Sequence, residues 1–552
     1  MKNILIKSLL IFAAVAFTTS CIKETFPEGS TVTASQVAES PSALEALLNS
    51  IPAAMVTTGT AGYLKTYSHH GDFGIGEIHL ITENQLEDFA TLADNPYYNR
   101  NYYWAMCQYQ GPTTWVAAYY WDCYYAWIKT CNDVISSILA GGEPTATTAP
   151  LLGKAYAYRA SFYLDLARIY EPKPNKYIDV SNVLGLTVPI INENTSEKDA
   201  TNNPRAPRTE MYNFILSDLT NAAKYLDGVV TPKNEPGIDV VNGLFARAYI
   251  EMGASGDAGA YAKAAEYAQK VIDAGYTPLT QSQWEDPTNG FNNMSSQNSW
   301  IWGIGITPEN FNNICTYAAF ICSEGQWGYA PLVQLGASKI FYEAINDNDF
   351  RKHSWLDPER LDYYNYKFAG SATDGQEFLA GNSNIPEAAD YESIKFRPGS
   401  GNVSDYNVGN AVDQPMMRVE EMYFIKMEAL AQDGDLAGAK KLLEDFMKLR
   451  YYKGEYICPA SNKEAFLEEM LFQKRVEFWG EGVLFFDYKR LDHGITRGYS
   501  GTNWPADFCF NCEGRSPEWN AVITRAEIQT NNGISEEQNN PDPSSFVPLW
   551  VE

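Results

Sequence analysis

Apolar residues recur at helical spacing along most of the chain after residue 36. Within residues 151–170 (LLGKAYAYRASFYLDLARIY), Ala155, Phe162, Leu166 and Ile169 share one stripe, and a second apolar stripe lies beside it. So wide an apolar surface predicts a helix with neighbours on both sides. Further helices are predicted from Pro41, over Trp115–Leu139, over Thr209–Leu226 with Thr209 as the N-cap, and from Lys463 to about Arg490.

Two distant stretches resemble each other weakly, Gly243–Ile272 and Met422–Leu449. Each contains an Ala-rich helix, a short loop with Gly and Asp, and a second helix that begins near small residues. Small residues let two helices approach closely, which is typical of tetratricopeptide helix pairs that stack to bury their faces. Because the two stretches are degenerate and far apart, they predict helix pairs inside a larger fold and not a free solenoid.

Residues 276–419 have a different character. They are rich in Asn, Gly, Ser, Asp and aromatic residues, and helical spacing is evident only near Ser338–Ile345. Residues 299–306 (SWIWGIGI) alternate as a strand does, which places Trp300 and Trp302 on one face and favours core packing for both. Irregular insertions on a rigid scaffold often carry binding residues.

These patterns together predict a mainly α fold in one domain, residues 36–552. The helical scaffold covers residues 36–275 and 420–490 and is built from tetratricopeptide-like pairs. The loop-rich insertion covers residues 276–419 and contains a few short strands, and C-terminal loops cover residues 491–552.

The first twenty residues predict a signal peptide. Lys2 and Lys7 precede the apolar run Leu9–Phe17, and small residues follow. The run is about half the length that a membrane-spanning helix needs. Cys21 comes directly after the small residues, so we predict a lipoprotein that carries its lipid on Cys21, although Thr18 stands where Leu is usual. The alternative is an ordinary signal peptide. Residues 21–35 are polar and predict a lipidated tether, and the chain is expected to be held by lipid alone.

The net charge of the chain excludes one class of partner. It is −27, and it becomes −29 without residues 1–20, which contain two Lys and no acidic residue. Such acidity argues against binding DNA, RNA or anionic lipid through charge. The 36 Tyr, 26 Phe and 13 Trp residues are a large aromatic complement, which suits both core packing and the stacking of sugar rings.

Cysteine and histidine residues predict no metal or cofactor. The eight cysteines after Cys21 are too few for a disulfide scaffold in a chain of this length. Cys509 and Cys512 form a lone CxxC, which predicts a local disulfide or two free thiols. His69-His70 and His79 lack a metal-ligand spacing, and we expect hydrogen-bonded loop histidines.

The carboxylates predict no catalytic centre. A glycosidase needs two carboxylates at a set separation, one with a raised pKa. The pairs Glu420-Glu421 and Glu468-Glu469 are expected on helix surfaces, and Glu477 and Glu481 lie one turn apart in a helix whose own Arg and Lys can pair with them. No hydrolase, metalloprotease or phosphate-binding motif is present in the sequence.

Two aromatic segments are candidate sites for a sugar ligand. Sugar rings stack on aromatic planes, and their hydroxyls need amides, carboxylates or Arg. Residues 95–104 (NPYYNRNYYW) read as a loop, and residues 325–329 (GQWGY) place Gly on both sides of a Trp, which suggests an exposed ring. The alternative is that these aromatics pack loops onto the body or face a partner. Trp284 fits either role. The candidate ligand-binding residues are Tyr97, Tyr98, Asn99, Arg100, Tyr102, Tyr103, Trp104, Trp327 and Tyr329.

Seven segments occur in an order typical of one family. They are Trp121–Ile135, Gly153–Tyr170, Arg208–Leu226, Tyr261–Tyr276, Arg418–Gln432, Arg475–Arg490 and Ile523–Pro541. Behind a lipobox, this order resembles the SusD-like (SusD/RagB) family of Bacteroidetes outer-membrane lipoproteins. The chain departs from the family where an Arg is expected after Gly482, and at Thr524, where Pro is usual.

The resemblance implies a non-catalytic receptor without cofactor at the cell surface. Members of the family cap a SusC-like, TonB-dependent outer-membrane barrel, capture glycan and deliver it to that transporter. Their binding faces gather loops from the N-terminal part and the central insertion, where the two aromatic segments lie. A family member that captures peptides or glycopeptides is the first alternative, and a surface glycoside hydrolase is the second.

Overall fold

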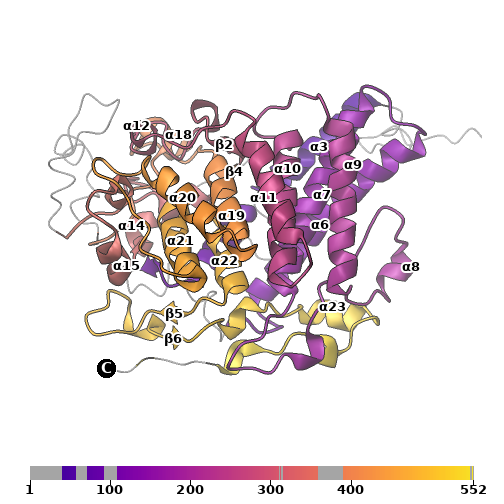
Figure 1. The fold of residues 1–552 in the computed structure, drawn as a ribbon. Coiled ribbons are helices and arrows are strands. Elements are labelled where there is room, and N and C mark those ends of the chain that lie inside the picture. Colours follow the sequence, from indigo (N-terminus) through magenta and orange to yellow (C-terminus); the bar gives the residue numbers. More distant parts are fainter. Residues whose placement is uncertain are drawn as a thin grey trace, which may run out of the picture.

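The computed structural model describes residues 40–57, 71–92, 109–309, 311, 315–358, 389–546 and 550. Its main body is a row of packed helices (Figure 1). They are α3 (Pro41–Ala54), α6 (Trp115–Ala140), α7 (Thr148–Tyr170), α9 (Arg208–Leu226), α10 (Ile238–Ala254), α11 (Ala260–Ile272), α19 (Val419–Gln432), α20 (Leu436–Met447), α21 (Lys463–Phe478) and α22 (Leu484–Leu491). The predicted mainly helical fold is confirmed.

The helix row brings the two weak repeats together. Helices α10 and α11 form one pair and α19 and α20 form the other, and α11 packs directly against α19. Before them in the row, α3 packs on α6, α6 on α7, α7 on α9, and α9 on α10. The insertion therefore leaves the row after α11 and returns to it at α19, so that two units far apart in sequence stack as neighbours.

Several helices begin at a residue whose side chain caps them. Thr114 caps α6 by accepting a hydrogen bond from the Ala117 amide at 3.4 Å, and Asn462 caps α21 through the Ala465 amide at 2.8 Å. The predicted N-cap role of Thr209 is wrong. Helix α9 begins one residue earlier, at Arg208, and the N-cap position is occupied by Pro207, whose fixed φ suits the entry of the chain into a helix.

The helix predicted over Lys463 to about Arg490 is two helices. Gly480 and Gly482 adopt φ of 76° and 75°, and these left-handed conformations end α21 and separate it from α22. Gly482 also lies against His79 of α4 (Ile75–Asn84), where a Cβ atom would come within 2.2 Å of the imidazole Cγ. A close contact between distant segments thus requires glycine at this break.

The insertion contains several short elements, and those of its helices that Figure 1 labels lie on the left of the picture. The elements are α12 (Gln281–Trp284), β2 (Trp300–Ile304), α13 (Tyr317–Ile321), α14 (Ala330–Val333), β3 (Leu335–Ala337), α15 (Lys339–Ala344), α18 (Tyr406–Gly409) and β4 (Gln414–Arg418). Strand β2 pairs antiparallel with β4, and β3 pairs antiparallel with β1 (Phe89–Thr91). Trp300 and Trp302 are buried, so their predicted core packing is confirmed.

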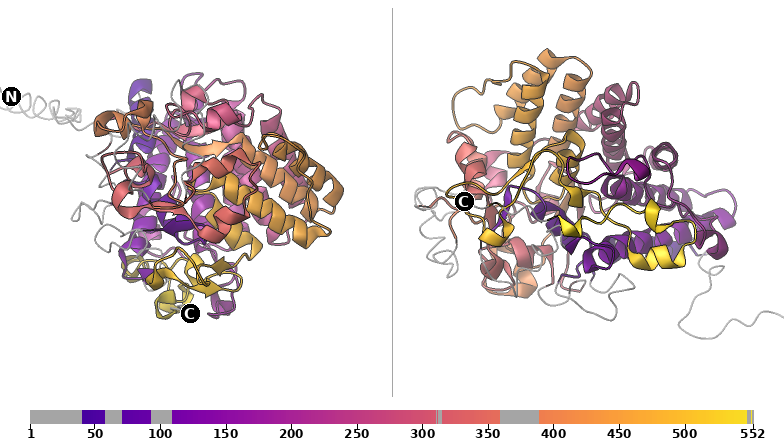
Figure 2. Two further views of the ribbon diagram at one scale, coloured as in Figure 1. Left: turned by 90° about the vertical axis from the view of Figure 1, so that its left-hand side faces the viewer. Right: turned by 90° about the horizontal axis from the view of Figure 1, so that it is seen from below.

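Two hydrophobic clusters meet at helix α4. The larger cluster fills the helix row and includes Ile75, Ile78 and Ile81, whereas the second fills the insertion and includes Leu80. All ten residues of α4 are buried, including the polar Glu77, His79, Thr82, Glu83 and Asn84. The sequence pattern did not predict this helix, because its polar residues face the interior and do not mark a solvent-exposed side. The C-terminal segment, with β5 (Ile495–Thr496), β6 (Asn511–Cys512) and α23 (Arg525–Thr530), runs along one end of the helices (Figures 1 and 2).

A buried charge cluster joins the insertion to the helix row. Glu477 on α21 accepts hydrogen bonds from Arg450 at 2.8 Å, Arg351 at 3.0 Å and Arg418 at 3.3 Å. All four side chains are fully buried. Burial opposes the ionisation of Glu477, but the three guanidinium groups hold its pKa well below the ordinary value.

Glu481 extends the same cluster. It binds Lys395 of the insertion at 2.7 Å and Arg418 at 2.7 Å. The expected pairing of Glu477 and Glu481 with Arg and Lys of their own helix is therefore wrong, since their partners come from other segments. Opposite charges that are buried together need such dense hydrogen bonding to offset the loss of solvation.

The acidic pairs expected on helix surfaces divide into two kinds. Glu468 is exposed, as expected, whereas Glu469 beside it is half-buried and accepts a hydrogen bond from the Tyr456 hydroxyl. Glu420 and Glu421 are buried, so the expectation is wrong for them. Glu421 binds Arg247 at 2.6 Å, and Glu420 accepts a hydrogen bond from the Leu279 amide at 2.7 Å. Neighbouring elements on both sides of α19 cover this helix, which leaves it no free surface at these positions.

A second charged cluster, at the end of α22, predicts a pH effect on stability. His493 lies 3.1 Å from Glu87 and 3.3 Å from Glu468, and Arg475 lies 2.7 Å from Glu87 and 2.5 Å from Asp88. Burial acts to lower the pKa of His493, but its hydrogen bonds to Glu468 and Glu87 outweigh burial and raise the pKa to about 9. The imidazolium form is thus favoured in the folded chain.

His493→Gln is expected to destabilise the chain at pH 6 by on the order of 2 kcal/mol, and by much less at pH 10. A raised folded pKa contributes stability that is complete below the unfolded value, about 6.5, and that is lost as the pH rises through about 9. Urea unfolding of both proteins at the two pH values measures the difference. An equal effect at pH 6 and pH 10 would contradict the charge pairing of His493.

Candidate functional site

The first predicted aromatic segment lies outside the described residues. It contains Tyr97, Tyr98, Asn99, Arg100, Tyr102, Tyr103 and Trp104. The described chain resumes at Tyr109, whose side chain is 36% exposed, and enters α6 after Gly111 and Pro112. The binding role of the segment stays a prediction, and Gly111 and Pro112 mark where it joins the described fold.

The second predicted segment is part of the core of the insertion. Trp327 and Tyr329 are 8% and 5% exposed, so the expectation of an exposed Trp327 ring is wrong. The reason is that Gly325 and Gly409 admit the ring: a Cβ atom at Gly409 would lie 2.5 Å from Cζ2 of Trp327. Tyr329 stacks on Phe320 with ring centroids 4.6 Å apart. Flanking glycines here permit close packing and do not expose the ring.

Trp284, His79, Cys509 and Cys512 are also buried, whereas His69 and His70 lie outside the described residues. Trp284 is buried and donates a hydrogen bond to Ser354 Oγ at 2.9 Å. Cys509 and Cys512 are buried free thiols, the second of the two predicted alternatives. His79 lies in α4 and not in a loop, but it is hydrogen-bonded as expected, since Gln414 lies 2.9 Å from its Nδ1. Burial lowers the pKa of His79 to about 4.

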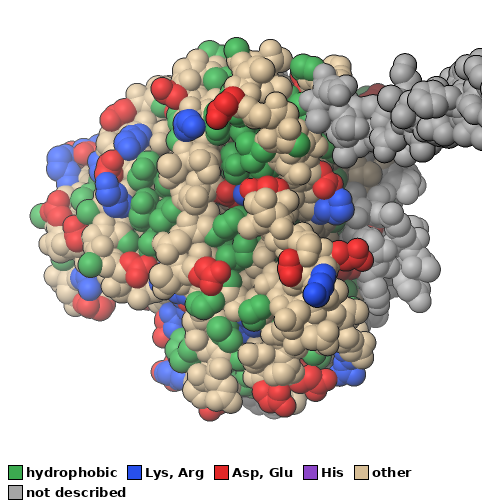
Figure 3. Space-filling view, turned by 90° about the vertical axis from the view of Figure 1, so that its right-hand side faces the viewer, with side chains coloured by type: hydrophobic (Ala, Val, Ile, Leu, Met, Phe, Trp, Pro, Cys, Tyr) green, Lys and Arg blue, Asp and Glu red, His purple; other side chains and the backbone are tan. Residues whose placement is uncertain are grey.

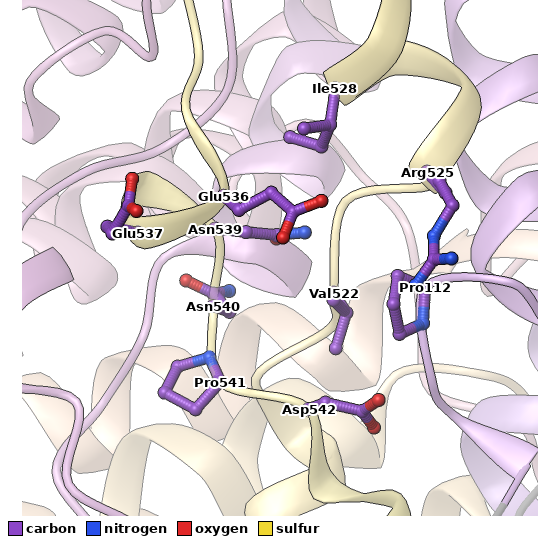
Figure 4. A pocket seen from close by; sticks show the side chains of 10 residues that line it. All are labelled: Pro112, Val522, Arg525, Ile528, Glu536, Glu537, Asn539, Asn540, Pro541 and Asp542. Carbon is purple, nitrogen blue, oxygen red and sulfur yellow. The ribbon is translucent and has the colours of Figure 1, made fainter.

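A cavity of about 310 Å³ lies where the C-terminal segment passes Pro112 (Figure 4). The backbone amide of Arg525 donates to the Pro112 carbonyl at 2.8 Å, which fixes α23 beside the start of α6. This volume is at the lower end of small-molecule sites in proteins. The cavity is lined by Pro112, Val522, Arg525, Ile528, Glu536, Glu537, Asn539, Asn540, Pro541 and Asp542.

Two asparagines hold one wall of this C-terminal cavity in place. Asn539 accepts a hydrogen bond from the Ile523 amide at 2.8 Å and donates to the Ile523 carbonyl at 2.9 Å. Asn540 is buried; it donates to the Tyr170 and Ala521 carbonyls and accepts from Arg205 at 3.0 Å. Because the side-chain amides of Asn539 and Asn540 hydrogen-bond within the protein, they fix the shape of the cavity. The exposed charged side chains of the cavity are the groups that can bind a ligand.

The charged groups of the cavity come from both sides. Figure 4 shows Arg525 on α23, and Glu536 extends towards it from the opposite side, with Glu537 beyond. Glu537 is exposed, and hydrogen bonds from Ser535 and its own backbone lower its pKa. Asp542 accepts a hydrogen bond from the Ser544 amide at 2.9 Å. The sequence analysis did not predict this cavity. Its one relevant observation was that the polar segment Ile523–Pro541 resembles the closing segment of the family.

The described residues contain no helix long and apolar enough to cross a membrane. Within the same part of the chain, no cluster of three or more His, Cys, Asp or Glu side chains is arranged to hold a metal ion. On the face shown in Figure 3, basic side chains are interspersed with acidic and uncharged ones.

Comparisons of the sequence identify the family. A family model described as starch-binding associating with outer membrane matches residues 76–250, and the model of the SusD family matches residues 333–545. The two stretches together span more than half of the 552 residues. The chain belongs to the SusD/RagB family. A search of curated proteins finds no match.

Solved structures share the fold at low sequence identity. A SusD-like carbohydrate binding protein from Bacteroides vulgatus ATCC 8482 is 21% identical, with a TM-score of 0.67 over 90% of this chain and 98% of that one. Surface glycan-binding protein A from Bacteroides thetaiotaomicron, solved in complex with laminarihexaose, is 16% identical, with a TM-score of 0.62 over 90% of this chain and 98% of that one. These similarities concern the fold.

Proposed function

We propose that this protein is a cell-surface lipoprotein that captures a glycan and delivers it to a SusC-like, TonB-dependent outer-membrane transporter, without catalysing a reaction. The observation that carries the proposal is the match of both halves of the chain to SusD-family models. A structural relative that was solved with laminarihexaose supports a glycan as the ligand. The lipid on Cys21 and the tether to residue 35 would hold the body at the outer membrane.

We further propose that the aromatic segment ending at Trp104 is the main glycan contact. Its five aromatic rings supply stacking faces, and its Asn and Arg side chains supply partners for hydroxyls. The segment leads through Tyr109 to Pro112, which lines the C-terminal cavity. Trp327 and Tyr329 support the insertion from within, since both are buried.

The double substitution Tyr103→Ala/Trp104→Ala is expected to weaken glycan capture about tenfold or more, because two stacking planes are lost. Affinity electrophoresis of the mature chain against a panel of soluble polysaccharides measures capture as retarded migration. Tyr452→Ala is the matched control, because Tyr452 is an exposed tyrosine that follows α20 and lies outside the insertion. Unchanged retardation of the double variant would refute the segment, and newly formed reducing ends would refute a non-catalytic receptor.

A peptide or glycopeptide ligand is the alternative within the same family. Adding peptides to the panel separates the two ligand classes. If peptides but no glycan bind the protein, it is a peptide receptor and not the proposed glycan receptor.

A further inference from the structure

Arg525 differs from the other described arginines in the use of its guanidinium. Each of the others makes an ion pair or hydrogen bond inside the protein through that group; examples are Arg159 with Asp218, Arg205 with Asn540, and Arg490 with Glu428. In the part of the chain that the structure describes, the guanidinium of Arg525 has no such partner. It is exposed at the edge of the C-terminal cavity.

The acidic side chains of the cavity also remain available. Glu536 and Glu537 form no ion pair among the described residues, although Arg525 lines the same cavity. The donors of Arg525 and the acceptors of Glu536 therefore face the cavity from opposite sides (Figure 4). A guanidinium presents N–H donors only, and an ionised carboxylate presents acceptors only.

The remaining walls are apolar and fixed. Pro112, Val522, Ile528 and Pro541 line the cavity, and the bonds of Asn539 and Asn540 hold the chain between them. Because these walls are already fixed, the protein loses less conformational entropy when a ligand binds. Apolar walls with a few convergent polar groups are the usual composition of a small-molecule site.

We propose that this cavity binds one uncharged sugar unit of the captured glycan. This proposal rests on the proposed function as a glycan receptor. It adds a second contact with the glycan, beside the aromatic segment, and specifies that the bound sugar unit is uncharged. A sugar hydroxyl both donates and accepts, so that neighbouring hydroxyls satisfy Glu536 and Arg525 together. The C–H groups of the ring contact the apolar walls. Three carboxylates against one guanidinium disfavour an acidic sugar through repulsion.

Binding measurements on the mature, full-length chain test the cavity. The probes are soluble neutral polysaccharides (a β-glucan, a starch-type glucan and a mannan), polygalacturonate as an acidic glycan, and the dipeptide glycylglycine. For each neutral glycan that the unaltered protein binds, Arg525→Ala and Glu536→Gln are each expected to weaken binding about tenfold. Arg525→Ala removes a charged donor, and Glu536→Gln replaces a charged acceptor with a weaker neutral one. Ile528→Trp fills the cavity without changing its charge and is expected to weaken binding as well.

Glu143→Gln is the matched control for charge, since Glu143 is exposed after α6, away from the cavity lining. Its binding should equal that of the unaltered protein. If Arg525→Ala, Glu536→Gln and Ile528→Trp all leave neutral-glycan binding unchanged, the proposed sugar site in the cavity is refuted. The proposed receptor function is not affected by that result. If polygalacturonate binds more strongly than every neutral glycan, the ligand of the cavity is an acidic sugar. If glycylglycine alone binds and its binding depends on Arg525, the ligand is a peptide. Either result refutes an uncharged sugar. Binding of no glycan by the unaltered protein overturns the receptor function itself.

Discussion

Glu477→Gln is expected to lower the free energy of unfolding by about 3–5 kcal/mol, because it removes a buried anion that three buried guanidinium groups share. Arg351, Arg418 and Arg450 all contact this carboxylate, and none of the four side chains reaches solvent. The three guanidinium groups keep their other partners, Asp349, Glu420 and Glu481. The cost arises because the buried cluster loses one negative charge, and the excess positive charge cannot regain its hydration. Denaturant unfolding of the mature chain measures the shift.

Glu464→Gln is the control for this change. Glu464 is an exposed residue in the first turn of the same helix, α21, and its substitution should change stability by no more than about 0.5 kcal/mol. An equally small effect of Glu477→Gln would show that the cluster does not hold the insertion to the helix row. The lowered pKa of Glu477 also implies that its contribution is present above the ordinary carboxyl pKa and is lost as the pH falls through the lower folded value.

Cys21→Ser is expected to release the protein from the membrane fraction almost completely. The substitution removes the thiol that would receive the diacylglycerol, and stable anchoring takes more than one acyl chain. Fractionation of cells followed by immunoblotting measures the membrane-bound share. The prediction matters for function, because a receptor that is lost from the surface cannot pass glycan to a membrane transporter.

Lys23→Gln is the matched control, since it alters the tether and keeps the lipidated residue. It should remain in the membrane fraction. Cys21→Ser protein that stays there after a high-salt wash would contradict the lipid anchor and leave an ordinary signal peptide as the alternative.

The long helices could be predicted closely because their signal is local. Trp115–Leu139 was predicted, and α6 spans Trp115–Ala140; the repeats at 243–272 and 422–449 correspond to the two helix pairs. Helical periodicity depends on residues three and four positions apart, which the sequence displays directly. Helix α4 was not predicted because its five polar residues are buried with its apolar ones, so that its sequence does not mark a solvent-exposed face.

Binding residues were harder to predict than helices. Glycine beside Trp327 is compatible with an exposed ring and with tight packing, and the choice depends on Gly409, about 80 positions away. The C-terminal cavity forms only because residues 522–542 pass Pro112, a contact across more than 400 positions. No local pattern contains that information.

The sequence by itself determined the family, the predicted export signal with Cys21, and the helix pairs, because motifs, apolar runs and periodicity are properties of neighbouring residues. The tertiary structure alone decided that α11 stacks on α19 across the insertion and that Glu477 faces three arginines from other segments. It also decided that the guanidinium of Arg525 has no partner among the described residues and lies beside a cavity. The physical reason is common to all three. Burial, ion pairing and cavity shape arise between segments that meet only after the chain has folded.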